Sequence, residues 1–296
     1  VIGNYAVLGR YEITFDQIGV GVDFNGIVVI VDGNNYVRNS LPHTFLWDAG
    51  SNHTFSFQSP LVVTPNAKQY VWTSTTGLSL LQSGTITVTM SGNVIGNYKT
   101  QYTVTFAQTG LSLDAVGTIV VVDTSAKTFG ALPYSKWVDS GSLVDYLYTS
   151  TVPSSVPGKR YRLDSVTGPT SPINVTSTTI VTGNYITQYQ ATFAQTGLNP
   201  IDATGTVVIV DTSSKIVGDL PFIKWVDSGT IVGYSYSSIV SSTVSGKRYR
   251  LNSVTGPVSP INVMSAVTIT GNYVAQYSVT FAQTGLDSSA TGTVVT

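Results

Sequence analysis

The chain has 296 residues, of which only 10% are charged, and its net charge is -1. This is far below the roughly 25% of an average soluble domain, and it argues against electrostatic capture of nucleic acid or of an anionic membrane. No apolar run approaches the ~18–20 residues of a membrane span. Cysteine is absent, which excludes disulfides, thiolate metal sites and a cysteine nucleophile.

One phrase of the sequence occurs three times. GNYKTQYTVTFAQTGL begins at Gly96, GNYITQYQATFAQTGL at Gly183 and GNYVAQYSVTFAQTGL at Gly271, and a shorter GNY begins at Gly3. Recurrence at a period of roughly 90 residues is typical of tandem domains. The sequence therefore predicts four repeats, over residues 1–95 (divergent), 96–182, 183–270 and 271–296, the last holding only the first strands of its unit.

The first repeat is a distant relative of the next two. ITFDQIG (13–19) stands where VTFAQTG stands later, and LPHTFLWDAGS (41–51) aligns with LPYSKWVDSGS (132–142). AKQYVWTS (67–74) aligns with GKRYRLDS (158–165).

Each repeat has the pattern of short β-strands. Tyr102, Val104 and Phe106 alternate with Thr, which is the period of a half-buried strand. Asp139 and Asp227 each begin an Asp-Ser-Gly turn. Turn signals every 8–12 residues over ~90 residues indicate an antiparallel β-sandwich of about seven strands. Because the Cys…Trp…Cys spacing is missing, we predict an immunoglobulin-like architecture only.

The joints between repeats are short. The stretch 173–193 (INVTSTTIVTGNYITQYQATF) runs from the last strand of one repeat into the first strand of the next, without a flexible linker. We therefore expect an all-β, rigid, beads-on-a-string rod. Tyr98, Tyr185 and Tyr273 are predicted to pack at its joints.

These motifs (GNYxTQY, the strand–DSG or DAG–strand hairpin and the KRYRL/KQYVW strand) resemble the tandem Ig-like repeats of archaeal cell-surface and extracellular proteins, including S-layer-like and filament proteins. The resemblance implies an exported protein that builds or decorates a surface assembly, for which our further expectations are self-assembly and a glycoprotein. It carries no catalytic residue over to this chain.

The two histidines, His43 and His53, both lie in the first repeat. With Asp48 and nearby serines they could form a hydrolase triad, but no GxSxG elbow is present. They could also ligate a metal ion, but no third ligand stands out. Their positions become Tyr134 and Val144 in the second repeat, so we expect neither catalysis nor a metal or cofactor site.

Five other residues have a functional interpretation as well as a structural one. Asp32, Asp123 and Asp211 each follow an apolar strand, where calcium binding is one interpretation and a strand-ending turn the simpler one. Lys136 and Lys224 could form a Lys–Asn isopeptide bond, although the first repeat has Phe at that position.

The densest charges are Arg160, Arg162, Arg248 and Arg250. Strand alternation places Tyr161 inward and the arginines outward. They could contact an acidic group of another chain, or only protect an edge strand from random pairing.

Asn52 and Asn174 begin N-x-Thr sequons, the acceptor pattern for N-glycosylation in exported proteins. Such sequons also arise by chance in a Thr-rich chain.

The partial fourth repeat leaves two interpretations. The chain is a window of a longer repeat protein, or its terminal strand joins the next copy by strand addition, which makes a head-to-tail filament.

Our leading hypothesis is a non-enzymatic structural subunit of an extracellular filament or cell-surface array, whose partner is itself. The alternatives are an adhesin or glycan-binding module centred on the first repeat, with Trp47 and Trp72, and the non-catalytic stalk of a secreted enzyme.

Overall fold

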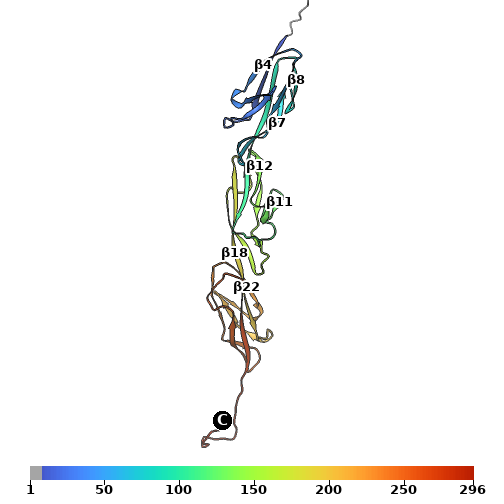
Figure 1. Ribbon diagram of the computed structural model, residues 1–296. Helices are drawn as coiled ribbons and strands as arrows, with labels where there is room; N and C mark the ends of the chain where they lie inside the picture. The colour runs from blue at the N-terminus through green and yellow to red at the C-terminus, as the bar shows by residue number, and fades with distance from the viewer. Residues whose placement is uncertain (1–8) are drawn as a thin grey trace, which may run out of the picture. The chain divides into compact units, whose positions relative to one another are not determined.

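The computed structural model describes residues 9–296, and nearly all of its elements are β-strands (Figure 1). The predicted all-β class is therefore confirmed, with several sheets that form sandwich-like layers. In these residues the helical elements are three short 3-10 turns: η1 (Arg38–Ser40), η2 (Phe129–Ala131) and η3 (Val217–Asp219).

The chain divides into two compact units, which are described separately. Their boundaries differ from those of the sequence repeats, because the second repeat contributes residues to both units; the division into repeats stays a prediction. Of the described residues, unit 1 comprises 9–109, Thr118–Thr149 and Ser165–Asn184, and unit 2 comprises Gly110–Gly117, Ser150–Asp164 and Tyr185–Thr296.

The large sheet of unit 1 contains the strands that carry the repeated phrase and their neighbours: β1 (Arg10–Ile18), β4 (His43–Asp48), β6 (Leu61–Thr64), β7 (Lys68–Gly77), β9 (Gly92–Thr109), β12 (Tyr134–Asp139) and the first half of β18 (Thr179–Thr196). In it β1 pairs antiparallel with β4, and β9 pairs antiparallel with both β7 and β12.

Smaller sheets complete unit 1. One has the order β3-β2-β5-β8, another β11-β10-β14, and β13 pairs with β17. Their bounds are β2 (Ile27–Val31), β3 (Asn34–Val37), β5 (Asn52–Phe57), β8 (Ser83–Thr87), β10 (Val120–Val122), β11 (Ser125–Lys127), β13 (Leu143–Val144), β14 (Tyr146–Tyr148) and β17 (Ile173–Asn174).

Unit 2 uses the same kinds of pairing. Its larger sheet joins β15 (Thr151–Pro153), most of β16 (Lys159–Thr167), the second half of β18, β19 (Ala203–Thr204), β22 (Phe222–Asp227), β25 (Ile239–Ser242), β26 (Lys247–Thr255) and β28 (Val267–Tyr277). Its smaller sheets are formed by β20 (Val208–Val210), β21 (Ser213–Lys215) and β24 (Tyr234–Tyr236), and by β23 (Ile231–Val232) with β27 (Ile261–Asn262).

The strand pairing differs from the purely antiparallel one that we predicted. Within unit 1, Ile13 of β1 lies in parallel register with Gly92 of β9, and Val104 of β9 with Thr179 of β18. Within unit 2, Ala191 of β18 lies in parallel register with Val267 of β28. Turn signals report only chain reversals between neighbouring strands, so they could not reveal pairs between strands about 75 residues or more apart.

Alternate residues of the repeated phrase form the core, as the period of two predicted. In unit 1 Val104 and Phe106 have exposed fractions of 0%, and in unit 2 Phe193 is equally buried. The corresponding residues of the last copy, Val279 and Phe281, are 74% and 73% exposed. The same local sequence is therefore core in two places and bare surface in a third.

This contrast gives a matched pair of substitutions. We expect Phe193→Ala to lower the free energy of unfolding by about 3–5 kcal/mol, because it leaves a cavity in the core of unit 2. The control Phe281→Ala, in the identical context Thr-Phe-Ala-Gln-Thr-Gly, should change it by no more than about 0.5 kcal/mol. Urea unfolding of the monomeric protein measures both. Equal losses for the two variants would contradict this assignment of the core.

Candidate functional site

An aspartate, a lysine and a tyrosine meet at three places in the structure. In unit 2, Asp114 accepts hydrogen bonds from Tyr161 Oη at 2.6 Å and Lys159 Nζ at 3.1 Å, and Ser154 also donates to it. Sequence reasoning missed these aspartates, although each follows the FAQTG-type phrase by a few residues. The other two clusters are Asp202 with Lys247, Tyr249 and Ser242, and Asp23 with Lys68 and Tyr70.

The electrostatics of these clusters favour an ion pair. Burial alone raises the pKa of Asp114, but hydrogen bonds from Ser154, Tyr161 and Lys159 outweigh burial and hold that pKa far below its usual range. Hydrogen bonds from Lys247, Tyr249 and Ser242 lower the pKa of Asp202 to about 2. Condensation of lysine with aspartate to an amide needs a neutral amine, so these ion pairs oppose such a covalent link. They act instead as non-covalent polar contacts that hold the strands of the core.

Ion pairs also join the residues considered for calcium and isopeptide sites. Lys136 Nζ lies 2.6 Å from Asp123 Oδ2, and Lys224 contacts Asp211 in the same way. Both aspartates have a positive φ, 51° and 52°, which suits a tight turn. The hydrogen bond from Lys136 lowers the pKa of Asp123. Burial acts in the opposite direction, but its effect is smaller. The structure thus places an aspartate, and not an asparagine, against each lysine.

In the first repeat the corresponding carboxylate takes a different partner. Phe45 occupies the position of Lys136, and His53 of β5 supplies the contact instead, with Nδ1 2.6 Å from Asp32 Oδ2. Ser51 Oγ lies 2.9 Å from Nε2 of the same ring. Ser51, His53 and Asp32 therefore form a Ser–His–Asp line, whereas the sequence had suggested Asp48 as the acid.

This line lacks two features of a nucleophilic site. The Ser51 hydroxyl donates to the Asp48 carbonyl at 2.7 Å. The backbone N–H groups of Gly50 and Ser51 donate to Val88 O and Asp48 O, so neither is free to stabilise an oxyanion. The hydrogen bonds hold the turn between β4 and β5.

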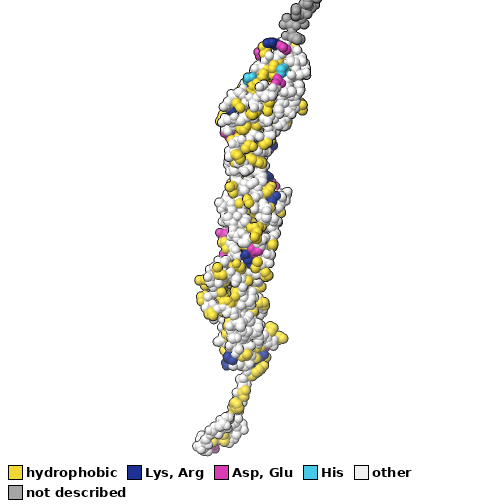
Figure 2. Space-filling model, in the orientation of Figure 1, with side chains coloured by type: hydrophobic (Ala, Val, Ile, Leu, Met, Phe, Trp, Pro, Cys, Tyr) yellow, Lys and Arg dark blue, Asp and Glu magenta, His cyan; other side chains and the backbone are white. Residues whose placement is uncertain are grey.

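Aromatic side chains line the same face, where we had looked for a glycan-binding patch. Both histidines reach the surface there, with hydrophobic side chains between them (Figure 2). The Trp47 ring is stacked on His53 at 3.6 Å and on Phe45 at 4.7 Å between centroids. These two stacked rings occupy surface of the indole on which a sugar ring would otherwise stack. Trp72 donates its indole N–H to Thr75 Oγ1 at 3.1 Å.

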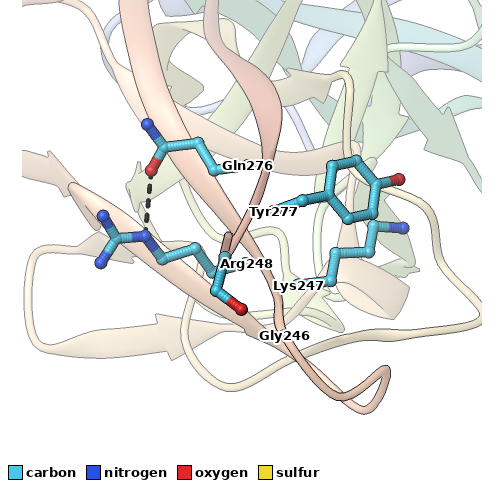
Figure 3. Close-up of a pocket in the computed structure, with 6 residues that line it drawn as sticks. Gly246, Lys247, Arg248, Gln276 and Tyr277 are labelled. Atoms are coloured by element: carbon cyan, nitrogen blue, oxygen red, sulfur yellow. Dashed lines mark hydrogen bonds between the residues drawn. The ribbon is translucent and has the colours of Figure 1, made fainter. Parts of the chain in front are cut away.

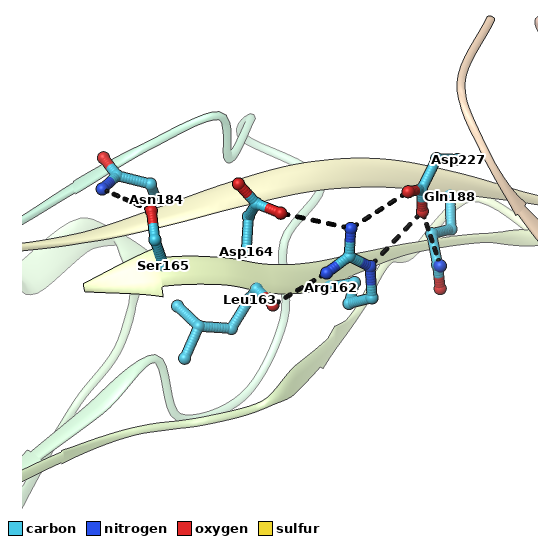
Figure 4. Close-up of polar contacts among 7 residues, drawn as sticks. All are labelled: Arg162, Leu163, Asp164, Ser165, Asn184, Gln188 and Asp227. Carbon is cyan, nitrogen blue, oxygen red and sulfur yellow. Dashed lines mark hydrogen bonds and ion pairs between the residues drawn. The ribbon is translucent and has the colours of Figure 1, made fainter. Parts of the chain in front are cut away.

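Two arginines of β16, Arg160 and Arg162, hold a polar network in unit 2, and Figure 4 shows the contacts of Arg162. Arg162 contacts Asp227 with Nη2···Oδ2 at 3.0 Å. Gln188 donates to the other oxygen of Asp227 at 2.7 Å and accepts a bond from Arg160 Nε at 2.7 Å. The Arg160 guanidinium also lies 4.3 Å from the Trp225 ring centroid, a cation–π contact. The hydrogen bond from Arg162 is the main reason that the pKa of Asp227 is lowered.

Unit 1 contains an equivalent network with a neutral residue in place of the arginine. Gln69 donates to Gln101 at 2.8 Å, and Gln101 donates to Asp139 at 2.7 Å. Lys99 Nζ lies 2.6 Å from the same carboxylate. In both units, therefore, a side chain of β7 or β16 contacts a glutamine, and that glutamine contacts an aspartate.

Arg248 and Arg250 of β26 have the same local sequence as Arg160 and Arg162 but fewer contacts. Arg248 Nε donates to Gln276 at 2.9 Å, as Arg160 does to Gln188. In the described part of the chain, no carboxylate lies within ion-pair distance of Arg250, which is exposed. An open pocket of about 690 Å³ adjoins Arg248 and Gln276 (Figure 3). Contacts of the four arginines with another chain stay a prediction.

The three predicted joint tyrosines are deeply buried. Tyr98 donates its hydroxyl to Gln58 O at 2.9 Å and Tyr273 to Ser237 O at 2.9 Å, and Tyr185 is 5% exposed. For Tyr98 and Tyr273 these hydrogen bonds lie within one unit each. A role of the three tyrosines at joints between repeats stays a prediction.

Asn52 and Asn174, the sequon residues, are both exposed on strands. Asn52 Oδ1 accepts a hydrogen bond from Thr87 at 2.6 Å. Their glycosylation stays a prediction.

Residues 9–296 contain no group of three or more His, Cys, Asp or Glu that could hold a metal ion. They also contain no helix long and apolar enough to cross a membrane.

Comparison with known proteins gives weak likenesses only. No protein-family model and no curated protein matches the chain. Among solved structures, it is similar to a variant of BcpA, the major pilin subunit of Bacillus cereus, at 11% identity and a TM-score of 0.26, with 90% of this chain and 99% of that chain covered. A streptococcal ancillary pilin is similar at 10% identity and a TM-score of 0.21, with 88% and 99% covered.

The buried clusters predict acid sensitivity. Because the folded-state pKa of Asp202 is about 2, only the unfolded chain binds a proton there as the pH falls below its ordinary 3.8. The contribution of Asp202 to the free energy of unfolding is therefore complete above about pH 5 and is lost between about pH 4 and pH 2. Urea unfolding across this range should show a shallower acid slope for Asp202→Asn than for the wild type. An unchanged slope would contradict the ion pair.

The same clusters predict the effect of removing one hydroxyl. Tyr161→Phe keeps the buried ring but leaves Asp114 without one of its donors, so the free energy of unfolding should fall by roughly 1–3 kcal/mol. Tyr102→Phe serves as a control at a partly exposed ring. A neutral effect of Tyr161→Phe would show that Asp114 does not depend on this bond.

The Ser–His–Asp line predicts no covalent reactivity. Because the hydroxyl of Ser51 is engaged and no oxyanion donors are free beside it, a fluorophosphonate probe should leave this residue unmodified at neutral pH. Mass spectrometry of the probe-treated chain provides the measurement. Labelling of Ser51 that disappears in His53→Ala would instead establish a nucleophile.

Proposed function

We propose that the chain is a structural subunit of an extracellular filament or cell-surface array, built from tandem Ig-like β-sandwich repeats. The repeats would span residues 1–95, 96–182 and 183–270, and residues 271–296 would begin a fourth. The partner is another such unit, joined head-to-tail.

The repetition of the contacts supports this proposal. Gln188 of β18 pairs with Asp227 of β22, as Gln101 of β9 pairs with Asp139 of β12. The same residues of each long strand bury their side chains and the same turns follow. A protein built from copies of one module is suited to extension by adding further copies.

The single observation that carries the proposal is this recurrence of the same contacts in successive copies of one module. The last copy of the repeated phrase follows the same pattern in sequence, although Val279 and Phe281 are 74% and 73% exposed, whereas equivalent residues of unit 2 are fully buried. β28 ends at Tyr277, so Val279 and Phe281 lie outside any strand here. As a strand, this segment would need a neighbour that covers its apolar face and accepts its backbone hydrogen bonds. Strand addition to another unit would supply both.

The other functions have less support. Catalysis would require a free nucleophile and oxyanion donors, and the Ser51 hydroxyl is already engaged. A glycan-binding site on the first repeat would require an accessible aromatic ring, and Trp47 is already stacked on His53 and on Phe45. We therefore propose a non-enzymatic, extracellular, associative role.

The proposal predicts concentration-dependent assembly. Sedimentation of the purified chain should reveal species larger than 31.4 kDa as its concentration rises, and electron microscopy should reveal elongated particles. Val279→Ser with Phe281→Ser should weaken assembly, because two apolar contacts are lost. The control Ile201→Ser, at a residue that is 89% exposed, should not. A wild-type chain that stays monomeric at every concentration would overturn the proposal.

A further inference from the structure

Trp137 of β12 and Trp225 of β22 occupy equivalent places, but the surroundings of their indole rings differ. In unit 2 the Arg160 guanidinium lies 4.3 Å from the Trp225 ring centroid. In unit 1 Gln69 stands in the place of Arg160, and its amide donates to Gln101 at 2.8 Å. Among residues 9–296, no cation or aromatic ring is stacked on Trp137. The half-buried Trp137 ring is therefore available to a ligand.

An open pocket of about 270 Å³ within unit 1 adjoins this ring. Thr103 of β9 lies opposite Trp137, and Thr105 lies opposite Ser135. Because Val104 between the two threonines faces the core, these side chains lie on the other face of the sheet. The Trp137 pocket is lined by Asn66, Thr103, Thr105, Ser135, Lys136 and Trp137.

Several hydrogen-bonding groups of the Trp137 pocket have capacity to spare. The Trp137 indole N–H has no acceptor in the described part of the chain, where no polar side-chain atom is buried without a partner, so this N–H is open to solvent. The Asn66 side chain is exposed and makes no hydrogen bond with described residues. Thr105 and Ser135 share one hydrogen bond of 2.7 Å, which leaves one of their two O–H groups free to donate.

This lining suits a neutral sugar better than a cation. The C–H face of a pyranose packs on an aromatic ring, while its hydroxyl groups exchange hydrogen bonds with polar side chains beside that ring. A cationic ligand would meet the Lys136 ammonium group and no carboxylate among the lining residues. Sites for drug-sized ligands have roughly 300–1,000 Å³, so the smaller Trp137 pocket matches a single sugar ring.

We propose that the Trp137 pocket binds one neutral pyranose ring, stacked on the indole and hydrogen-bonded to Asn66 and to the Thr105–Ser135 pair. This inference goes beyond the proposed function, because a structural subunit needs no ligand at this place. The site is also distinct from the aromatic face of the first repeat around Trp47.

Unit 2 offers an internal comparison, because the same part of its sheet lacks most of these groups. Pro157 stands in the place of Asn66, Gln190 in the place of Thr103 and Ile223 in the place of Ser135. The Arg160 guanidinium also lies against the Trp225 ring. We therefore expect the equivalent surface of unit 2 to bind no sugar.

The indole N–H resonances report binding directly, because the chain has only four tryptophans. Methyl glycosides of mannose, glucose, galactose and N-acetylglucosamine are added in turn to the isotope-labelled chain, and proton–nitrogen NMR spectra are recorded. At least one glycoside should shift the Trp137 resonance along a saturable curve. The affinity should be millimolar, since one stacked ring and a few hydrogen bonds make the contact. The Trp225 resonance should stay in place; Trp137→Phe and Trp225→Phe assign the two signals.

Two substitutions that copy unit 2 test the lining. Gln69→Arg should bring a guanidinium against the Trp137 ring, and unit 2 shows that the module accepts arginine at this position. Ser135→Ile removes one hydroxyl group. Each should weaken sugar binding by roughly tenfold. The control Thr44→Ile, at the position of the first repeat that aligns with Ser135, should leave binding unchanged.

The outcomes are distinct. A shift confined to Trp137 that Gln69→Arg and Ser135→Ile both weaken would establish the site. If no glycoside moves this resonance, or if Trp225 moves equally, the inference is wrong. If arginine amide moves it and the sugars do not, the ring is a cation site and the sugar assignment fails. None of these results bears on assembly, which sedimentation measures separately.

Discussion

The alternation of buried and exposed side chains along the repeated phrase is the constraint on which this structure depends. With no disulfides and few charges, each unit is stabilised by the burial of residues such as Phe106 and Phe193 between its sheets. A shift of register by one residue would expose that entire set of side chains. The Asp–Lys–Tyr clusters work alongside this burial, because each fixes one strand against a loop through directional bonds inside the core.

Charged residues are few, and most of them recur at equivalent positions. The carboxylate of Asp123 receives Lys136, whereas that of Asp32 receives His53 from a neighbouring strand. The aspartate at this position thus has a cationic or N–H partner in each repeat, although the residue that provides the partner differs. A similar substitution relates Gln69 in unit 1 to Arg160 in unit 2. The scaffold therefore tolerates different chemistry as long as the aspartate remains satisfied.

The candidate site residues illustrate what local patterns can reveal. The outward direction of Arg160 followed from strand alternation, but its contact with Trp225 depends on a strand more than sixty residues away. The Ser51–His53–Asp32 line was not predicted, because Asp32 reaches β5 only through sheet pairing. The clusters around Asp114 and Asp202 were missed for the same reason, although the recurrence of both partners in the sequence contained a signal.

By itself the sequence determined the all-β class, the repeated phrase and the inward face of its strands, because these depend on local composition and on a period of two. Only the tertiary structure decided the parallel pairing of β9 with β18 and the partners of the aspartates. Those features depend on which distant strands meet, and that outcome is set by the packing of whole sheets.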